Sequence, residues 1–179
     1  MATRAIVIAG ASSGVGTAGV QIAKLIGARV IATTSSDEKA AKLRSIGADE
    51  VINYRSEKAF DRIRKLTDKR GVEVVFDHIG AALWDENIKL LTKGGRLVTC
   101  GATSGYEAVT DLRYVFFKQL QILGSTMGRK GDLLTIMDLI AQGKLSPVID
   151  RVMPLADVRE AHQIIEAGKH FGKIVLIPG

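Results

Sequence analysis

The feature that most constrains the fold is a glycine-rich turn between an apolar run and an amphipathic segment. Residues 5–9 form a short apolar run, and residues 10–16 read Gly-Ala-Ser-Ser-Gly-Val-Gly. Small and apolar residues then recur at helical spacing from 15 to 26. A strand, a glycine turn and a helix in this order favour a dinucleotide site, because glycines let the backbone approach a pyrophosphate and a helix N-terminus attracts anions. A glycine turn without a ligand is the alternative.

Composition limits the class of protein. The 179 residues are enough for one full core, and no run approaches the ~20 apolar residues of a membrane span. The single cysteine, Cys100, excludes an intramolecular disulfide and a cysteine-rich zinc site. The net charge of +6 does not indicate nucleic acid, because acidic residues interrupt the densest basic stretch, 55–70. We therefore expect a cytoplasmic protein with no membrane, nucleic-acid or metal site.

Strand-like and helix-like segments alternate along the first 146 residues. Strands are expected near 5–9, 29–32, 51–54, 72–76, 97–100 and 122–124, and helices near 15–26, 35–46, 56–66, 83–91, 112–119 and 133–141. Ser35 and Glu38 have the spacing of a capping box, and Ser56 can cap the next helix. The alternation predicts an α/β fold, a doubly wound parallel sheet of Rossmann type with strand order 3-2-1-4-5-6. Ligands of such sheets bind beyond the carboxyl ends of the strands.

The last 33 residues are not required by this sheet. An extended segment at 147–153, an amphipathic helix at 155–167 and a strand at 173–177 are expected there. We therefore divide the chain into a dinucleotide-binding domain, 1–146, and a C-terminal extension, 147–179. The apolar strand needs a neighbour, so we expect the extension to form a homodimer. Folding back onto its own sheet is the alternative.

Several stretches resemble the cofactor domain of the medium-chain dehydrogenases/reductases, most of all the quinone oxidoreductase and zinc-type alcohol dehydrogenase branches. They are residues 14–18, 21–24, 27–32, 46–49, 51–54, 94–96, 121–125 and 171–176. The glycine turn departs from the family pattern, with Ala11 and Ser13 at two usual glycine positions. The resemblance implies an oxidoreductase that transfers hydride to a quinone, an enone or a carbonyl. It also implies that a separate catalytic domain supplies the substrate pocket, so that this chain is incomplete for catalysis alone and its catalytic residues are unknown.

The resemblance also suggests the cofactor. It places Thr34 where NAD enzymes carry an acidic residue for the ribose hydroxyls, and a 2′-phosphate is not repelled by a threonine. Ser36, Lys39 and Tyr54 can bind such a phosphate, which favours NADP (NADPH) over NAD. The remaining cofactor-binding candidates are Ser13, Gly14 and Val15 at the phosphates, Asp77 and Gly80 at the adenosine, Gly101 and Ala102 at the nicotinamide, and Lys173.

Two other functions stay open at this point. One is a stand-alone dinucleotide-binding or regulatory module without catalysis. The other is a short-chain dehydrogenase-like reductase, whose Tyr-x-x-x-Lys pair is matched by Tyr114 and Lys118. That pair comes early in the chain, and we interpret Tyr114 as a packing aromatic. Cys100 is expected to be a buried strand residue, and His78 to be structural or to contact the cofactor.

Overall fold

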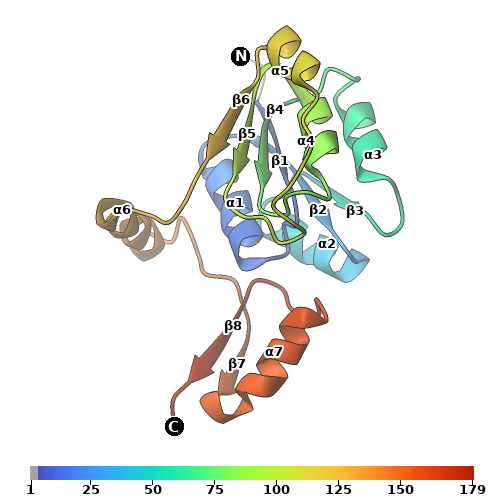
Figure 1. Ribbon diagram of the computed structural model, residues 1–179. Coiled ribbons are helices and arrows are strands. Elements are labelled where there is room, and N and C mark those ends of the chain that lie inside the picture. The colour runs from blue at the N-terminus through green and yellow to red at the C-terminus, as the bar shows by residue number, and fades with distance from the viewer. Residues whose placement is uncertain (1–3) are drawn as a thin grey trace.

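The computed structural model describes residues 4–179 (Figure 1), and a six-stranded parallel sheet forms its centre. The strands are β1 (Ala5–Ile8), β2 (Arg29–Thr34), β3 (Glu50–Asn53), β4 (Val72–Asp77), β5 (Leu91–Thr99) and β6 (Gln121–Gly124). Their order is β3-β2-β1-β4-β5-β6, and every pairing is parallel. The predicted doubly wound α/β sheet is confirmed.

Helices cover both faces of the sheet. They are α1 (Gly14–Leu25), α2 (Asp37–Ser45), α3 (Ala59–Leu66), α4 (Trp84–Leu90) and α5 (Leu112–Lys118). Neighbouring residues of a strand point to opposite faces, and the core divides accordingly. Ile8 packs with Val20 of α1 and Leu43 of α2. Val7 packs with Ile63 and Ile88, from α3 and α4. Both halves of the core thus hold β1 in place, at the centre of the sheet.

Three local predictions were wrong. Ser36, not Ser35, caps α2, and its Oγ accepts a hydrogen bond from the Lys39 amide (3.3 Å). Ser56 does not cap α3, because its hydroxyl donates to Asn53 O in the preceding turn. The strand expected at 97–100 begins six residues earlier, since Leu91 pairs with Val72 directly after α4.

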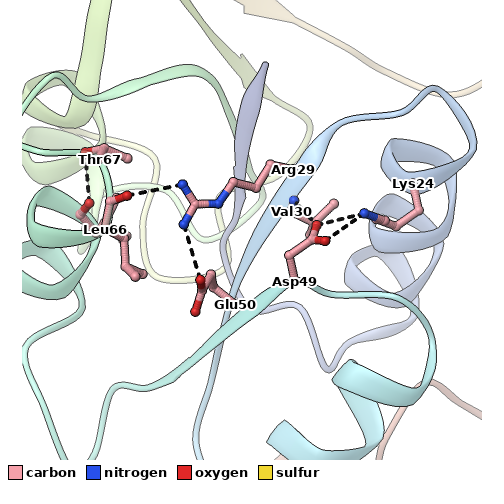
Figure 2. A network of polar contacts seen from close by, with 8 residues as sticks. Lys24, Arg29, Val30, Asp49, Glu50, Leu66 and Thr67 are labelled. Carbon is pink, nitrogen blue, oxygen red and sulfur yellow. Dashed lines mark hydrogen bonds and ion pairs between the residues drawn. The ribbon is translucent and has the colours of Figure 1, made fainter. Parts of the chain in front are cut away.

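Polar contacts at the amino ends of the strands fix the start of β2 (Figure 2). The carboxylate of Asp49 accepts hydrogen bonds from the Val30 amide (2.7 Å) and from the Lys24 ammonium (2.9 Å). Partial burial opposes ionisation of Asp49, but these two donors outweigh it and hold the pKa of the carboxyl below its usual range. Arg29 pairs with Glu50 and donates to Leu66 O. These contacts tie the end of α1 and the starts of β2 and β3 together.

The C-terminal part builds a second, smaller unit (Figure 1). After α6 (Lys130–Ala141) come β7 (Ile149–Pro154), a 3₁₀ turn (Leu155–Asp157), α7 (Val158–Glu166) and β8 (Lys173–Ile177). β7 and β8 pair in parallel with each other and do not join the six-stranded sheet. The unit is anchored by Phe171, which is buried in the core beside α1 and α2, and by the Gly172 amide, which donates to Ser12 O (2.9 Å).

Candidate dinucleotide cleft

The glycine turn lies tightly between β2 and the start of α1. Gly10 has φ = +57°, a left-handed conformation that favours glycine. Its amide donates to Thr33 Oγ1 (3.2 Å), and the Ala11 amide donates to Thr33 O (2.9 Å). A Cβ at Gly16 would lie 2.5 Å from Ala11 Cα. The turn therefore places the first amides of α1 at the carboxyl edge of the sheet, as the motif predicts.

Ser13 caps this helix. Its Oγ accepts a hydrogen bond from the Gly16 amide (3.0 Å) and lies 3.2 Å from Nε2 of His78, which follows β4. A serine at a usual glycine position thus stabilises the turn and links it to the neighbouring loop. The sequence gives no signal for this contact, because the two residues are 65 positions apart.

Lys173 lies over the N-terminus of α1. A Cβ at Gly14 would fall 2.1 Å from its Cε, so the lysine side chain occupies the space that the glycine leaves open. Within residues 4–179 no carboxylate pairs with the Lys173 ammonium. An uncompensated cation beside the positive end of a helix is well suited to bind phosphate. The structure brings Lys173 to Ser13, Gly14 and Val15 from the far end of the chain.

A second group of polar residues lies where β2 ends. Thr34 is only 1% exposed, and its Oγ1 has no hydrogen-bond partner among the described residues. Ser36 follows as the cap of α2, and Tyr54 is half-exposed on the adjoining loop. The Lys39 ammonium donates to Gly168 O in the C-terminal unit (2.5 Å). Burial lowers the pKa of Lys39, and Asp150 and Glu38 oppose this effect.

The carboxylates beside Lys39 on α2 are already engaged. Asp37 accepts a hydrogen bond from Asn53 Nδ2 (2.9 Å), and Glu38 pairs with Lys42 (2.8 Å). The hydrogen bond from Lys42 and its charge lower the pKa of Glu38. The end of β2 itself carries the hydroxyl of Thr34 in place of an acid, as the sequence suggests.

The loops after β4 and β5 form the other half of the cleft. Asp77 is fully buried, and its carboxylate accepts hydrogen bonds from the amides of Ile79 (3.1 Å) and Gly80 (3.0 Å). Its visible role is therefore to shape the loop. Gly80 has φ = +89°, and a Cβ there would meet Gly105 O at 2.6 Å. A Cβ at Gly101 would meet His78 O at 3.1 Å.

A cavity of about 560 Å³ lies between these loops and the end of β6. Its walls include Gly80, Gly101 and Ala102, together with Trp84 and Cys100. The expected burial of Cys100 in a strand was wrong, because β5 ends at Thr99 and the next residue turns into the open cavity. Partial desolvation raises the pKa of this exposed thiol, and the charge of Asp77 raises it further.

Tyr114 and Lys118 do not form a catalytic pair. The Lys118 ammonium donates to the carbonyls of Lys89 (2.9 Å) and Leu91 (2.7 Å), at the edge of the sheet opposite the cleft. Tyr114 packs against the core, as expected, and the Lys118 ammonium lies 5.3 Å from the centre of its ring. In the described part of the chain, no three His, Cys, Asp or Glu side chains are grouped as metal ligands. No helix of residues 4–179 has the length and apolarity to cross a membrane.

The sequence and the fold of this chain are similar to those of known dehydrogenases and reductases. The family model of zinc-binding dehydrogenases matches residues 14–142. Quinone oxidoreductase 1 of Escherichia coli is 32% identical over 94% of this chain and 55% of its own length. A crystal structure of an NAD-dependent alcohol dehydrogenase is 43% identical, with a TM-score of 0.91 over 98% of this chain and 51% of that one. The 2-octenoyl-CoA carboxylase reductase CinF, solved with NADP and 2-octenoyl-CoA, is 28% identical, with a TM-score of 0.90 over 98% of this chain and 43% of that one.

Each comparison covers most of this chain, but it covers only part of the relative's own length. The chain spans about half the length of the curated relatives it matches, from 42% of the crotonyl-CoA reductase of Streptomyces avermitilis to 55% of the E. coli quinone oxidoreductase. The stretch that matches is the half that carries the dinucleotide-binding domain. The resemblance to quinone oxidoreductases and alcohol dehydrogenases is confirmed.

Proposed function

Because the chain belongs to the zinc-binding dehydrogenases, a family of medium-chain dehydrogenases/reductases, we propose that it is the NADPH-binding half of an oxidoreductase that acts on a quinone, an enone or a carbonyl compound. The observation that carries the proposal is the cationic N-terminus of α1. The amides of Gly14 and Val15 open this helix, while that of Gly16 is bound by Ser13 Oγ, and the Lys173 side chain fills the space beside Gly14. This combination of donors and charge fits a pyrophosphate.

The preference for NADP rests on the end of β2. An NAD site needs a carboxylate for the ribose hydroxyls, and that same carboxylate would repel a 2′-phosphate. Here the strand ends in Thr34, whose buried hydroxyl has no hydrogen-bond partner within residues 4–179, and Ser36 and the Lys39 cation follow closely. The relatives include both an NAD-dependent alcohol dehydrogenase and a reductase solved with NADP. The residues at the end of β2 therefore support NADP as the cofactor better than sequence identity to these relatives does.

The chain's own residues bind and orient the cofactor, while a bound nicotinamide supplies the hydride. Ser13, Gly14 and Val15 would hold the phosphates, and Asp77 would keep Gly80 in position. Gly101 and Ala102 line the cavity in which the nicotinamide would lie. A substrate would face that cavity once a catalytic domain closes it, because water must be excluded and the reacting atoms held close.

We expect the chain to be cytoplasmic, to act on a small-molecule substrate only with a catalytic domain, and to bind neither nucleic acid nor membrane. A homodimer through residues 147–179 stays a prediction. It is supported by the exposed apolar side chains of Ile149, Val152 and Ile177 on the paired strands β7 and β8.

Titration of the protein with NADPH and NADH, followed by nicotinamide fluorescence, tests the proposal. We expect saturable binding of both, with NADPH at least tenfold tighter. Thr34→Asp should remove most of this difference, because the new carboxylate repels the 2′-phosphate and accepts the free ribose hydroxyls. Thr135→Ala, on the exposed helix α6, is the control and should change neither affinity. Equal affinity for the two cofactors, or tighter binding of NADH, would contradict the NADP assignment.

A further inference from the structure

The ring of His78 is held against the glycine turn at the start of α1. Its Nε2 lies 3.2 Å from Ser13 Oγ, and its Cε1 would lie only 3.1 Å from a Cβ at Gly10. The backbone of His78 is held as well, because its carbonyl accepts from the amide (3.4 Å) and the hydroxyl (3.3 Å) of Thr103. The imidazole therefore has a defined position beside the hydroxyl that caps α1.

The hydroxyl of Ser13 can take part in three hydrogen bonds, because such an oxygen donates once and accepts twice. Ser13 Oγ already accepts from the Gly16 amide at 3.0 Å, which leaves one lone pair and the proton. When Nε2 of His78 carries no proton, the Ser13 proton points to the ring. When Nε2 is protonated, the ring donates to the remaining lone pair of Oγ, and the Ser13 proton is released. The protonation of one histidine nitrogen thus decides where this hydroxyl points.

The direction of the Ser13 proton matters because Ser13 belongs to the proposed phosphate site. The Gly16 amide is used for the cap, so the hydroxyl proton is what the cap itself offers to an anion. A hydrogen bond to a charged oxygen is about twice as strong as one between neutral groups. A second donor behind the hydroxyl polarises it and strengthens that bond further.

Resting on the proposed function, we propose that His78 is a positioning residue, which donates from Nε2 to Ser13 Oγ and thereby turns the hydroxyl proton of Ser13 towards the bound pyrophosphate. The imidazole acts on the ligand only through Ser13 in this arrangement. The sequence offers His78 as a proton carrier or a structural residue, and its place behind the cap of α1 assigns it this role instead.

The charges around the ring determine when this donor is present. Lys173 reaches the turn from β8 and disfavours a second cation there. Asp77 precedes His78, but its carboxylate is engaged by two amides of its own loop, and Cys100 donates its backbone amide to Asp77 O (3.0 Å). Each phosphate of a dinucleotide brings a negative charge to the turn and favours the imidazolium. Histidine changes its charge between about pH 5 and 8, so binding in this range should take up a proton.

Isothermal titration calorimetry with NAD tests the inference. NAD carries the pyrophosphate but lacks the 2′-phosphate, which itself titrates near pH 6. Titrations at one pH in buffers of different ionisation enthalpy give the number of protons taken up on binding. We expect the wild type to take up a fraction of a proton at about pH 7, and its affinity for NAD to rise roughly tenfold from about pH 8 to about pH 5.5.

Two variants separate this role from other effects of the histidine. His78→Gln keeps an N–H donor close to the position of Nε2 but does not titrate. It should bind NAD at pH 8 with nearly the affinity of the wild type, without proton uptake and without dependence on pH. Ser13→Gly introduces a residue that is tolerated as an N-cap and leaves the histidine in place. It should bind NAD more weakly and also lose the proton uptake, because the imidazole acts only through Ser13 Oγ.

His162→Gln is the matched control, since His162 is exposed on α7. It should leave the affinity and the proton uptake unchanged. Binding of NAD by the wild type without proton uptake, or uptake that persists in His78→Gln or in Ser13→Gly, would overturn this inference alone. Failure of the wild type to bind either NAD or NADPH would overturn the proposed function, and this inference with it.

Discussion

Two glycines of the same turn should respond to alanine in different ways, because different atoms face them. At Gly16 a Cβ would lie 2.5 Å from Ala11 Cα and 2.6 Å from Ala11 C and O, all of which are backbone atoms. At Gly14 it would lie 2.1–2.8 Å from the last three atoms of the Lys173 side chain. Backbone cannot move without displacing the turn, whereas the end of a lysine side chain can swing away.

The magnitudes follow from this difference. Overpacking against rigid atoms costs about 1–3 kcal/mol, so Gly16→Ala should lower the melting temperature by roughly 2–12 °C in a chain of this length. Gly14→Ala replaces glycine at the start of a helix, and the gain in helix propensity, up to ~1 kcal/mol, offsets the displacement of Lys173. Its stability should stay within about 1 kcal/mol of the wild type, while NADPH binding weakens because the phosphate loses a well-placed cation.

Differential scanning calorimetry and NADPH titration of both variants make the comparison. Gly19→Ala, on the same helix, is the control, because its Cβ would meet only side-chain atoms at 3.4–3.5 Å, an ordinary contact. A Gly14→Ala variant that is less stable than Gly16→Ala, or that binds NADPH as tightly as the wild type, would refute this explanation.

Three further predictions concern other parts of the molecule. Asp49→Ala should cost about 2 kcal/mol at pH 7, since a carboxylate that accepts from an amide and an ammonium is lost. The folded-state pKa of Asp49 is lowered, so this contribution is complete above the unfolded pKa of about 3.9 and is lost as the pH falls through the folded value. Urea unfolding should therefore show a smaller difference at pH 3, and an equal difference at both pH values would contradict the assignment. Lys39→Ala should weaken NADPH binding about tenfold and leave NADH binding unchanged; a loss shared by both cofactors would mean that the lysine acts only through its bond to Gly168. Light scattering should show a dimer for the full chain and a monomer for residues 1–143, whereas a monomeric full chain would exclude the homodimer.

The layout of the sheet could be predicted from the sequence because the local patterns and the rules of topology agree. Apolar strands alternate with amphipathic helices, and right-handed connections leave few strand orders for such an alternation. The glycine turn was equally informative, since the close approach of Gly16 to Ala11 is a requirement of the motif itself. These features depend on neighbours in the chain or on a general rule of topology.

The predictions that failed depend on finer details. Ser35 and Ser36 are both good caps, and the choice between them was fixed by the end of β2 at Thr34 rather than by residue type. Cys100 was expected in a strand because cysteines are often buried, but β5 ends one residue too early.

Long-range contacts were the least accessible from the sequence. Lys39 donates to a carbonyl 129 residues away, and Ser13 lies beside a histidine 65 residues away. Such contacts join segments that are distant in the chain, so no local pattern predicts them. Asn87 looks like an ordinary polar residue of an amphipathic helix. Its burial and its place in the lining of a cavity appear only in the structure.

The structure of the protein in complex with NADP tests the central claim most directly. The account predicts the pyrophosphate over the first amides of α1 within contact of the Lys173 ammonium, and the 2′-phosphate beside Ser36 and Lys39. It also places the nicotinamide in the cavity lined by Gly101 and Ala102. A cofactor whose phosphates lie away from the N-terminus of α1, or whose 2′-phosphate points into solvent with no contact to Ser36 or Lys39, would contradict it.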